Sequence, residues 1–261
     1  MTLRHWLILE SNSVGKCTFV IPMAGRGSRF AQRGYQMPKW RIEVRGKSLL
    51  EWSVDSLPLD QCGKLIFVGL KEHQPRYSLT TYVEQRYADL AEVRVILLNE
   101  VTRGQAETVL MAKDEIDTDA GLLIFNSDTR FSSSTLRENL NRRDVDGVIG
   151  AFTSSAERFS YARLNEGFVV ETAEKKVISP HALTGLYHFS SARDFIRVAE
   201  ARVASGVMDK GEFYVAPLYN DIIASGRNRF IIDTASSIDI LGTPEEVESF
   251  EKCPVAMPSE V

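Results

Sequence analysis

Residues 17–30 read CTFVIPMAGRGSRF, and this stretch decides the fold. Its first part, Cys17–Met23, is a short apolar run of the kind that forms a buried β-strand. The run ends in a turn that contains Gly25 and Gly27, where the lack of side chains lets backbone N–H groups approach an anion closely. We therefore expect a strand that delivers the chain into a ligand-binding loop.

The segments that follow alternate between strand and helix patterns. Ser48 and Glu51 form a capping box, which predicts a helix from residue 48 to about residue 57. Further helices are predicted at 80–90 and 105–113, and strands at 64–70, 93–98 and 121–126. This alternation predicts an α/β fold, a Rossmann-like three-layer α/β/α arrangement with a mostly parallel mixed sheet.

After Gly147 the strands follow one another with few helices between them. They are predicted at 147–152, 161–164, 168–171 and 183–189, which favours antiparallel additions to the sheet. Later helices are predicted at 192–204 and 215–223, a strand at 230–233, and a helix that Thr243 caps. No repeat or linker is visible, so we expect a single domain over 17–253, with an extension at 1–16 and a tail at 254–261.

Composition restricts the classes of protein. Of the 261 residues 44% are hydrophobic and 25% charged, as in ordinary globular proteins. No apolar run approaches the roughly 20 residues of a membrane span, and residues 6–9 are too few for a signal-peptide core. The three cysteines are scattered and the four histidines lack metal-ligand spacing. We expect a cytoplasmic protein with neither a disulfide framework nor structural zinc.

The charge is unevenly distributed. The chain carries a net charge of −4, which argues against a nucleic-acid partner. Between Gly25 and Lys47, however, seven basic residues face one acid, Glu43. A local cationic cluster on an acidic chain indicates a site for an anionic small molecule.

The cationic cluster contains the groups that bind phosphate. Arg29 can donate to phosphate oxygens through its planar guanidinium, and Lys39, which follows Pro38, supplies a second cation. For the glycines and these cations alone, a solvated basic loop beside a structural turn accounts for the pattern about as well. The ordered series of strand, glycine turn, Pro-Lys, Gly-Lys and capped helix favours a phosphate cradle.

The series VIPMAGRGSRF, MPKW and VRGKSLLEW resembles the sugar-phosphate nucleotidyltransferases, the pyrophosphorylases that make nucleotide sugars. The resemblance covers about residues 18–250 and is densest in the first third. It implies that Arg29 and Lys39 are catalytic and hold the triphosphate. It also implies a nucleotide-binding set made of Ala24, Gly25, Arg26, Gly27, Ser28, Arg29, Lys39, Asn99, Gly104 and Gln105, with Glu100 as a further base contact.

Asp128 follows the predicted strand at 121–126, and ligands of open α/β sheets bind at the carboxyl ends of strands. Taken alone, an aspartate there more often caps a turn. The resemblance implies instead that Asp128 is catalytic and is the principal Mg²⁺ ligand. For a second metal carboxylate the family shows Asp-x-Gly-Thr, whereas this chain has an extra residue in IDILGT, so Asp239 is the nearest candidate and Asp233 the reserve.

The second substrate is assigned through the same resemblance. It implies that Asp128, Glu174, Lys175, Gly185, Tyr187 and Glu212 contact a sugar-1-phosphate, with Lys175 in a catalytic role. The residue types alone are equally compatible with structural roles. Lys175 and Lys176 are also typical of a solvated surface. Lys176, one position later, is an alternative to Lys175 for the contact with the sugar phosphate. Glu212 and Gly104 are also typical of ordinary helix starts.

These expectations define a function: transfer of a nucleoside monophosphate from an NTP to a sugar-1-phosphate or similar phosphomonoester, with release of pyrophosphate and with Mg²⁺ as cofactor. Two alternatives remain, a nucleotide-sugar-dependent glycosyltransferase of related fold and a catalytically silent nucleotide-binding regulatory domain. The base and the acceptor are undetermined. No membrane partner is expected, and a homo-oligomer is compatible with the sequence.

Overall fold

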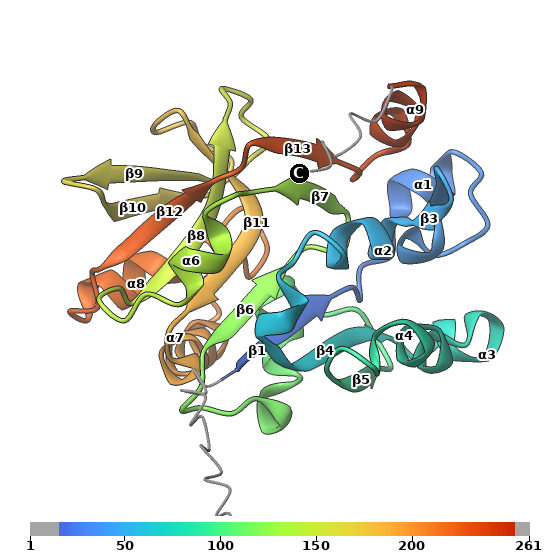
Figure 1. The fold of residues 1–261 in the computed structure, drawn as a ribbon, viewed down its shortest axis with the longest axis horizontal. Coiled ribbons are helices and arrows are strands. Elements are labelled where there is room, and N and C mark those ends of the chain that lie inside the picture. Colours follow the sequence, from blue (N-terminus) through green and yellow to red (C-terminus); the bar gives the residue numbers. More distant parts are fainter. Residues whose placement is uncertain (1–15, 254–261) are drawn as a thin grey trace, which may run out of the picture.

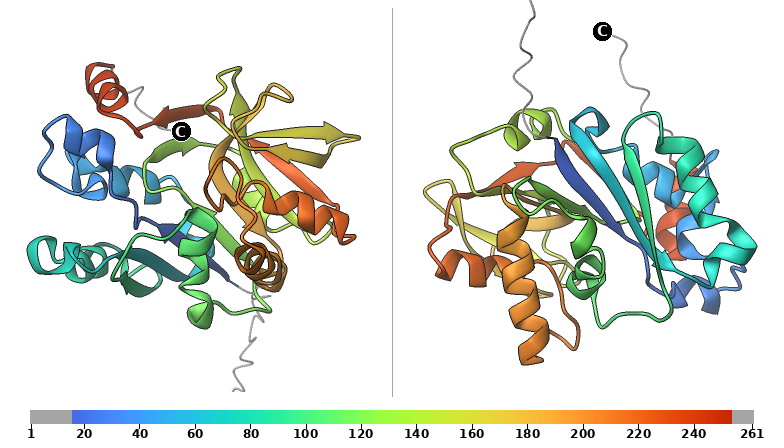
Figure 2. Two further views of the ribbon diagram at one scale, coloured as in Figure 1. Left: turned by 180° about the vertical axis from the view of Figure 1, so that it is seen from behind. Right: turned by 90° about the horizontal axis from the view of Figure 1, so that it is seen from below.

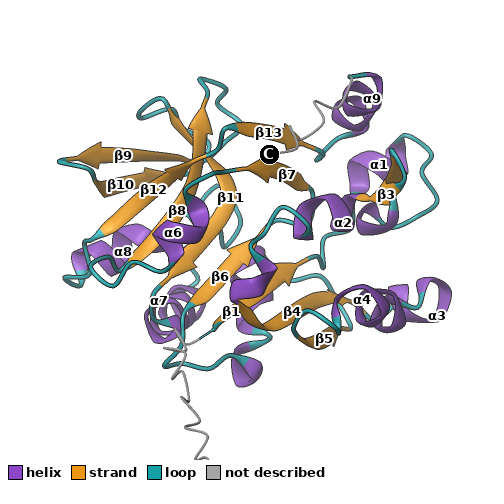
Figure 3. Cartoon of the chain, viewed as in Figure 1, coloured by secondary structure: helices purple, strands orange, loops and turns teal. Residues whose placement is uncertain are grey.

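The computed structural model describes residues 16–253 and shows a mixed β-sheet with helices on both faces (Figures 1 and 3). One half of the sheet is parallel. It consists of β5 (Glu92–Leu98), β4 (Cys62–Leu70), β1 (Cys17–Pro22) and β6 (Leu122–Phe125), side by side in that order. Their carboxyl ends therefore meet at one edge of the sheet, where the loops after β1 and β6 emerge.

The other half of the sheet is largely antiparallel. The long strand β11 (His181–Phe189) pairs antiparallel with β6 and joins the two halves. The strands beyond it are β8 (Gly147–Thr153), β9 (Tyr161–Asn165), β10 (Phe168–Ala173) and β12 (Phe230–Thr234). Among these pairings only the one between β12 and β8 is parallel. The chain reaches β12 through a crossover that contains a helix, which is the usual connection between parallel strands.

Helices lie on both faces of the sheet (Figure 2), and a hydrophobic core fills the space between the sheet and the helices on each face. The first core packs against α5 (Gln105–Leu110), α7 (Ala192–Ser205) and α8 (Leu218–Ala224). The second packs against α2 (Leu49–Val54), α4 (Leu79–Tyr87) and α6 (Leu136–Leu140). The predicted three-layer α/β/α class with a mixed sheet is confirmed.

Several short elements were not predicted from the sequence. Strands β7 (Thr129–Ser132) and β13 (Ser237–Ile240) pair antiparallel as a ribbon outside the main sheet. The other short elements are α1 (Ser28–Gln32), β2 (Glu43–Val44), β3 (Lys47–Ser48) and α3 (His73–Tyr77). Helix α8 begins at Leu218 rather than at 215, since Pro217 occupies its N-cap. The expected extension and tail lie almost wholly outside the described residues.

A third, smaller core joins the two ends of the described chain. Phe30 of α1 and Leu49 of α2 pack with Val247 and Phe250 of the last helix, α9 (Pro244–Lys252). Arg45 also donates a hydrogen bond to the carbonyl of Phe250. The segment after β1 is thus supported by residues from the end of the chain. None of the helices within residues 16–253 is both long and apolar enough to cross a membrane.

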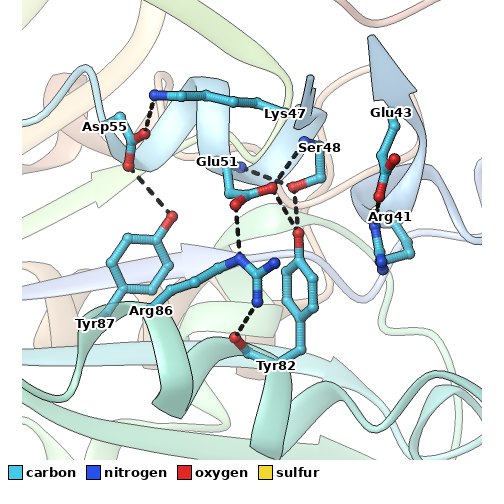
Figure 4. A network of polar contacts seen from close by, with 9 residues as sticks. All are labelled: Arg41, Glu43, Lys47, Ser48, Glu51, Asp55, Tyr82, Arg86 and Tyr87. Carbon is cyan, nitrogen blue, oxygen red and sulfur yellow. Dashed lines mark hydrogen bonds and ion pairs between the residues drawn. The ribbon is translucent and has the colours of Figure 1, made fainter. Parts of the chain in front are cut away.

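The capping box of α2 extends into a polar network (Figure 4). Glu51 accepts hydrogen bonds from the Ser48 backbone at 2.8 Å, from the Tyr82 hydroxyl at 2.7 Å and from Arg86 at 2.6 Å. Partial burial alone would raise the pKa of Glu51, but these donors outweigh it and lower the pKa to about 2. The network fixes the start of α2 against α4.

We expect Glu51→Gln to lower the free energy of unfolding by roughly 1–2 kcal/mol at pH 7, through loss of the charged partner of a cap and an ion pair. The folded-state pKa lies below the ordinary value of 4.5. The stabilisation by Glu51 is therefore complete above about pH 4.5 and is lost as the pH falls toward 2. Urea unfolding of both proteins at pH 7 and pH 3 measures this difference.

Glu84→Gln is the matched control, because Glu84 is exposed on α4 and makes no ion pair within residues 16–253. Its effect on the free energy of unfolding should be small at both pH values. If the difference in the free energy of unfolding between wild type and Glu51→Gln were the same at pH 7 and pH 3, the assigned role of the Glu51 charge would be contradicted.

Candidate functional site

A pocket of about 890 Å³ opens at the carboxyl ends of β1 and β6. Its walls come from the loop after β1, the start of α5, the loop after β6, and segments on either side of β9 and β10. Of the predicted nucleotide-binding, catalytic and substrate-binding residues, all except the two candidate base contacts, Asn99 and Glu100, line this pocket. In particular, Arg29 and Asp128 lie on one cavity rather than on opposite sides of the molecule.

The glycine turn presents unused donors to the pocket. None of the backbone N–H groups from Ala24 to Arg29 donates to an acceptor within residues 16–253. Gly27 has a φ of 61°, and a methyl group on it would approach the Cβ of Lys39 to 3.0 Å. A glycine is therefore needed here both for the backbone conformation and for the close passage of Lys39.

Two cations flank these donors. Arg29 is exposed and has no acidic partner within the described residues, so its guanidinium is free to bind an anion. Lys39 begins a short 3₁₀ turn whose next residue, Trp40, is buried and donates a hydrogen bond to His73 at 3.2 Å. This anchor fixes the backbone of Lys39, and the lysine side chain contacts the carboxylate of Asp128.

Asp128 lies where β6 leaves the sheet, and the backbone N–H of Leu241 holds its carbonyl at 2.8 Å. A Cβ atom added to Gly242 would lie 3.3 Å from one carboxylate oxygen of Asp128 and 3.4 Å from Oε2 of Glu246. That Glu246 oxygen is buried and has no hydrogen-bond partner within the described residues. An unpartnered buried carboxylate oxygen beside Asp128 fits a bound cation, since oxygen ligands suit Mg²⁺.

The structure does not support Asp239 as the second metal ligand. Asp239 lies on β13, opposite Arg130 of β7, and the two side chains form an ion pair at 2.5 Å. Asp239 does not line the pocket. The reserve candidate, Asp233, is buried and accepts hydrogen bonds from Thr135 and Asn139, so its role is structural. The extra residue in IDILGT thus coincides with a ribbon that turns Asp239 toward Arg130.

The start of α5 forms the wall next to the glycine turn. Gly104 has a φ of 150°, and a methyl group on it would lie 2.4 Å from the backbone nitrogen of Phe213. Phe213 donates to the Arg103 carbonyl at 2.9 Å and accepts from the Ala106 N–H at 2.9 Å. Asn99 is exposed and lies outside the pocket lining, so the prediction of a base contact at Asn99 gains no support.

Gly104→Ala should destabilise the fold by roughly 2–3 kcal/mol, because the new side chain meets backbone atoms that cannot move aside. For a chain of this size, that corresponds to a fall in Tm of roughly 5–10 °C. Thermal unfolding measures it. Gly25→Ala is the control, since no atom lies within 4 Å of its added methyl group and its Tm should stay unchanged. Equal Tm values for both variants would refute the close approach.

The opposite wall is built from β10, β11 and the loop before α8. Glu174 is largely buried; burial raises its pKa above the ordinary value, although a hydrogen bond from Ser160 acts in the other direction. Lys175 adopts a φ of 49° and donates to the Tyr214 hydroxyl at 2.5 Å. Tyr214 in turn donates to Glu212 at 3.0 Å. Lys175 lines the pocket and Lys176 does not, which favours Lys175 as the predicted contact.

Comparison with known proteins assigns this arrangement to a family. Residues 19–209 match the model of the MobA-like NTP transferase domain. The chain belongs to that family. A solved structure of a nucleoside-diphosphate-sugar pyrophosphorylase from Vibrio cholerae RC9 is similar at 30% identity and a TM-score of 0.79, covering 90% of this chain and 100% of that one. The predicted relationship to sugar-phosphate nucleotidyltransferases is confirmed.

Two further relatives are more distant in sequence. UTP–glucose-1-phosphate uridylyltransferase AglF of Haloferax volcanii is 26% identical over 247 residues, which cover 89% of this chain and 94% of AglF. The bifunctional protein GlmU of Thermoanaerobacter pseudethanolicus is 25% identical over 245 residues, and this match spans only 50% of GlmU. The inositol-1-phosphate CTP transferase of T. maritima, at 14% identity and a TM-score of 0.70, shares the fold.

Some pocket residues of this MobA-like transferase were missed in the sequence. They are Asn126, Arg158, Tyr214 and, at the edge of the Asp128 site, Glu246. Arg158 lies in an irregular loop and is held by Glu246, 88 positions away in the chain. A pairing between residues so far apart in the chain leaves no pattern in the sequence around either residue. Asn126, directly before Ser127 and Asp128, could have been found from its place at the strand end.

Proposed function

We propose that this chain transfers a nucleoside monophosphate from an NTP to a sugar-1-phosphate, with release of pyrophosphate. The observation that carries the proposal is the division of the pocket. On one side, the loop after β1 brings Arg29, Lys39 and N–H donors that have no partner within residues 16–253. Asp128 follows β6, the neighbour of β1 in the sheet, and Lys175 follows β10 on the far side, in the antiparallel half, with hydroxyl and carboxylate groups around it. The first side suits a triphosphate, and the far side suits a phosphate that carries a polyhydroxylated ring.

In the proposed reaction a phosphate oxygen of the acceptor attacks the α-phosphorus, and the bond from that phosphorus to the β-phosphate oxygen breaks. The attacking oxygen is anionic near neutral pH, so a general base is not needed. The side chains position two polyanions and neutralise their charge. Arg29 and Lys39 bind the triphosphate, and Lys175 draws the acceptor phosphate toward it.

Asp128 would hold Mg²⁺, with the unpartnered Glu246 oxygen as an additional carboxylate ligand close by. The ion would supply positive charge at the phosphates during transfer. The contact between Lys39 and Asp128 has a consequence for this step. A metal bound to the Asp128 oxygen that Lys39 contacts would replace the lysine there, and the triphosphate would offer Lys39 new partners.

The acceptor side is assigned from its chemistry. Glu174 and Glu212 accept hydrogen bonds, and Tyr187 and Tyr214 provide hydroxyl groups, so the wall is able to bind several ring hydroxyls at once. Lys175 lies among them without an ion-pair partner within residues 16–253 and suits one phosphate, whereas the nearby Arg158 is paired with Glu246. This pattern favours a sugar phosphate over an acceptor with several phosphates.

The test is a pyrophosphate-release screen of CTP, UTP, dTTP, GTP and ATP against a set of sugar-1-phosphates with Mg²⁺. We expect at least one pair to release pyrophosphate and to form the matching nucleotide sugar. Consumption of a nucleotide sugar without pyrophosphate formation would instead indicate a glycosyltransferase. Triphosphate binding in a thermal-shift assay without turnover on any acceptor would indicate a regulatory domain.

A further inference from the structure

Two side-chain amides lie where the two sides of the pocket meet. Gln105 begins α5 next to Gly104, and Asn126 follows β6 two residues before Asp128. Nε2 of Gln105 donates to Oδ1 of Asn126 at 2.8 Å. The pair therefore connects the helix beside the glycine turn with the strand end that carries Asp128.

The Asn126 side chain is held from a second direction by β11. Gly185 has a φ of 88°, and a methyl group on it would lie 2.1 Å from Nδ2 of Asn126 and 2.4 Å from its Cγ. Any other residue at 185 would thus displace the amide. The Asn126 backbone is fixed as well, because Ser53 donates its hydroxyl hydrogen to the Asn126 carbonyl. The amide is preorganised before any ligand arrives.

Each amide keeps one unused group. Within residues 16–253, Nδ2 of Asn126 has no hydrogen-bond acceptor and Oε1 of Gln105 has no donor. Both residues are half-buried and line the pocket. Besides their mutual hydrogen bond, the pair therefore offers the N–H donors of Asn126 Nδ2 and the acceptor Oε1 of Gln105, and that bond restricts the orientation of both amides.

A ligand group that both donates and accepts would satisfy this pair. A phosphate oxygen only accepts, and would leave the Gln105 oxygen without a partner, whereas a hydroxyl does both. Position supports a hydroxyl too. Asn126 is two residues from Asp128, next to the reacting phosphates, and the groups bonded directly to those phosphates are the ribose and the acceptor ring.

We propose that Gln105 and Asn126 together bind a ring hydroxyl beside the reacting phosphates and make the enzyme select substrates that carry it. The hydroxyl belongs either to the ribose or to the acceptor sugar. This inference rests on the proposed function, because both rings are substrates of that reaction. Gln105 and Asn126 are then specificity-determining residues, and Gly185 is the residue that leaves room for them.

The test compares matched substrates that differ by one hydroxyl. The active NTP is compared with its 2′-deoxy and 3′-deoxy analogues, and the active sugar-1-phosphate with its deoxy analogues. We expect wild type to prefer one hydroxylated substrate by about tenfold or more in kcat/KM, because its absence leaves polar groups unpaired. The analogue that shows this loss identifies the ring.

Gln105→Met and Asn126→Leu keep the side-chain size and remove the amides. Each should reduce the preference to within about twofold, and the double variant should lose no more than either single variant, because the two residues act as a unit. Ser53→Ala is the matched control. This variant removes a hydrogen bond to the Asn126 backbone carbonyl and leaves the Asn126 side-chain amide intact. We therefore expect kcat/KM to change by the same factor for a hydroxylated substrate and for its deoxy analogue.

Three results separate the possible outcomes. A preference that disappears in both amide variants and persists in Ser53→Ala supports the proposal. Active wild type without any preference among the deoxy analogues, or a preference that survives both substitutions, overturns it. Failure of the proposed function is a different result, since no triphosphate and acceptor would then release pyrophosphate, and with it the inference about the hydroxyl fails as well.

Discussion

Replacing Asp128 by asparagine is expected to lower kcat by roughly 10²–10³, in line with the loss of a charge-stabilising group at the reacting phosphates. The amide keeps the size of the side chain but loses the charge that would hold Mg²⁺. Lys39 also loses its contact partner in the free enzyme. Steady-state kinetics with a verified substrate pair measures the loss, and circular dichroism shows that the fold persists.

Asp239→Asn is the matched control for this experiment. Asp239 is the nearest candidate in the sequence for a second ligand, although the motif has an extra residue there, and it pairs with Arg130 outside the pocket. Its substitution should leave kcat close to that of wild type. The site assignment fails if Asp128→Asn retains near-wild-type turnover, or if Asp239→Asn is the more damaging of the two.

Arg29→Ala is expected to lower kcat/KM for the triphosphate by roughly 10²–10³, because a free bidentate donor to phosphate is removed. Arg29→Lys should recover only part of this loss, since an ammonium group lacks the planar pair of donors. Measurement of kcat and KM at varied NTP with saturating acceptor separates weaker binding from slower transfer.

Arg33→Ala tests whether position matters rather than charge alone. Arg33 lies just after α1, one turn beyond Arg29, but it faces Glu245 and Glu248 at 3.6 and 3.8 Å and does not line the pocket. Its kinetic constants should match those of wild type. A comparable loss in both arginine variants would mean that α1 contributes a general positive field and no specific phosphate contact.

The parts of the fold that follow local rules were predictable from the sequence. The strand at 17–22, the capping box at Ser48 and Glu51, and the helix start at Thr243 depend on neighbouring residues only, and the structure contains each of them. The glycine turn and the cations after it were likewise readable. Their chemistry requires particular residue types within a short segment.

The acceptor side and the second carboxylate were less accessible, because they depend on pairings across the chain. The ribbon of β7 and β13 joins residues more than a hundred positions apart, and it alone turns Asp239 toward Arg130. From the sequence alone, Glu246 is predicted only as the glutamate three residues after the helix N-cap Thr243. In the structure the carboxylates of Glu246 and Asp128 both approach Gly242, and Oε2 of Glu246 has no hydrogen-bond partner within residues 16–253.

The small core around Phe30, Leu49, Val247 and Phe250 bears on the order in which the protein can become competent during translation. The bond from Arg45 to the Phe250 carbonyl joins residues 205 positions apart. On the ribosome the glycine turn is made directly after β1, while α9, the helix that packs behind it, is made only after β13. A nascent chain stalled before α9 could assemble most of its sheet and still lack a supported nucleotide cradle.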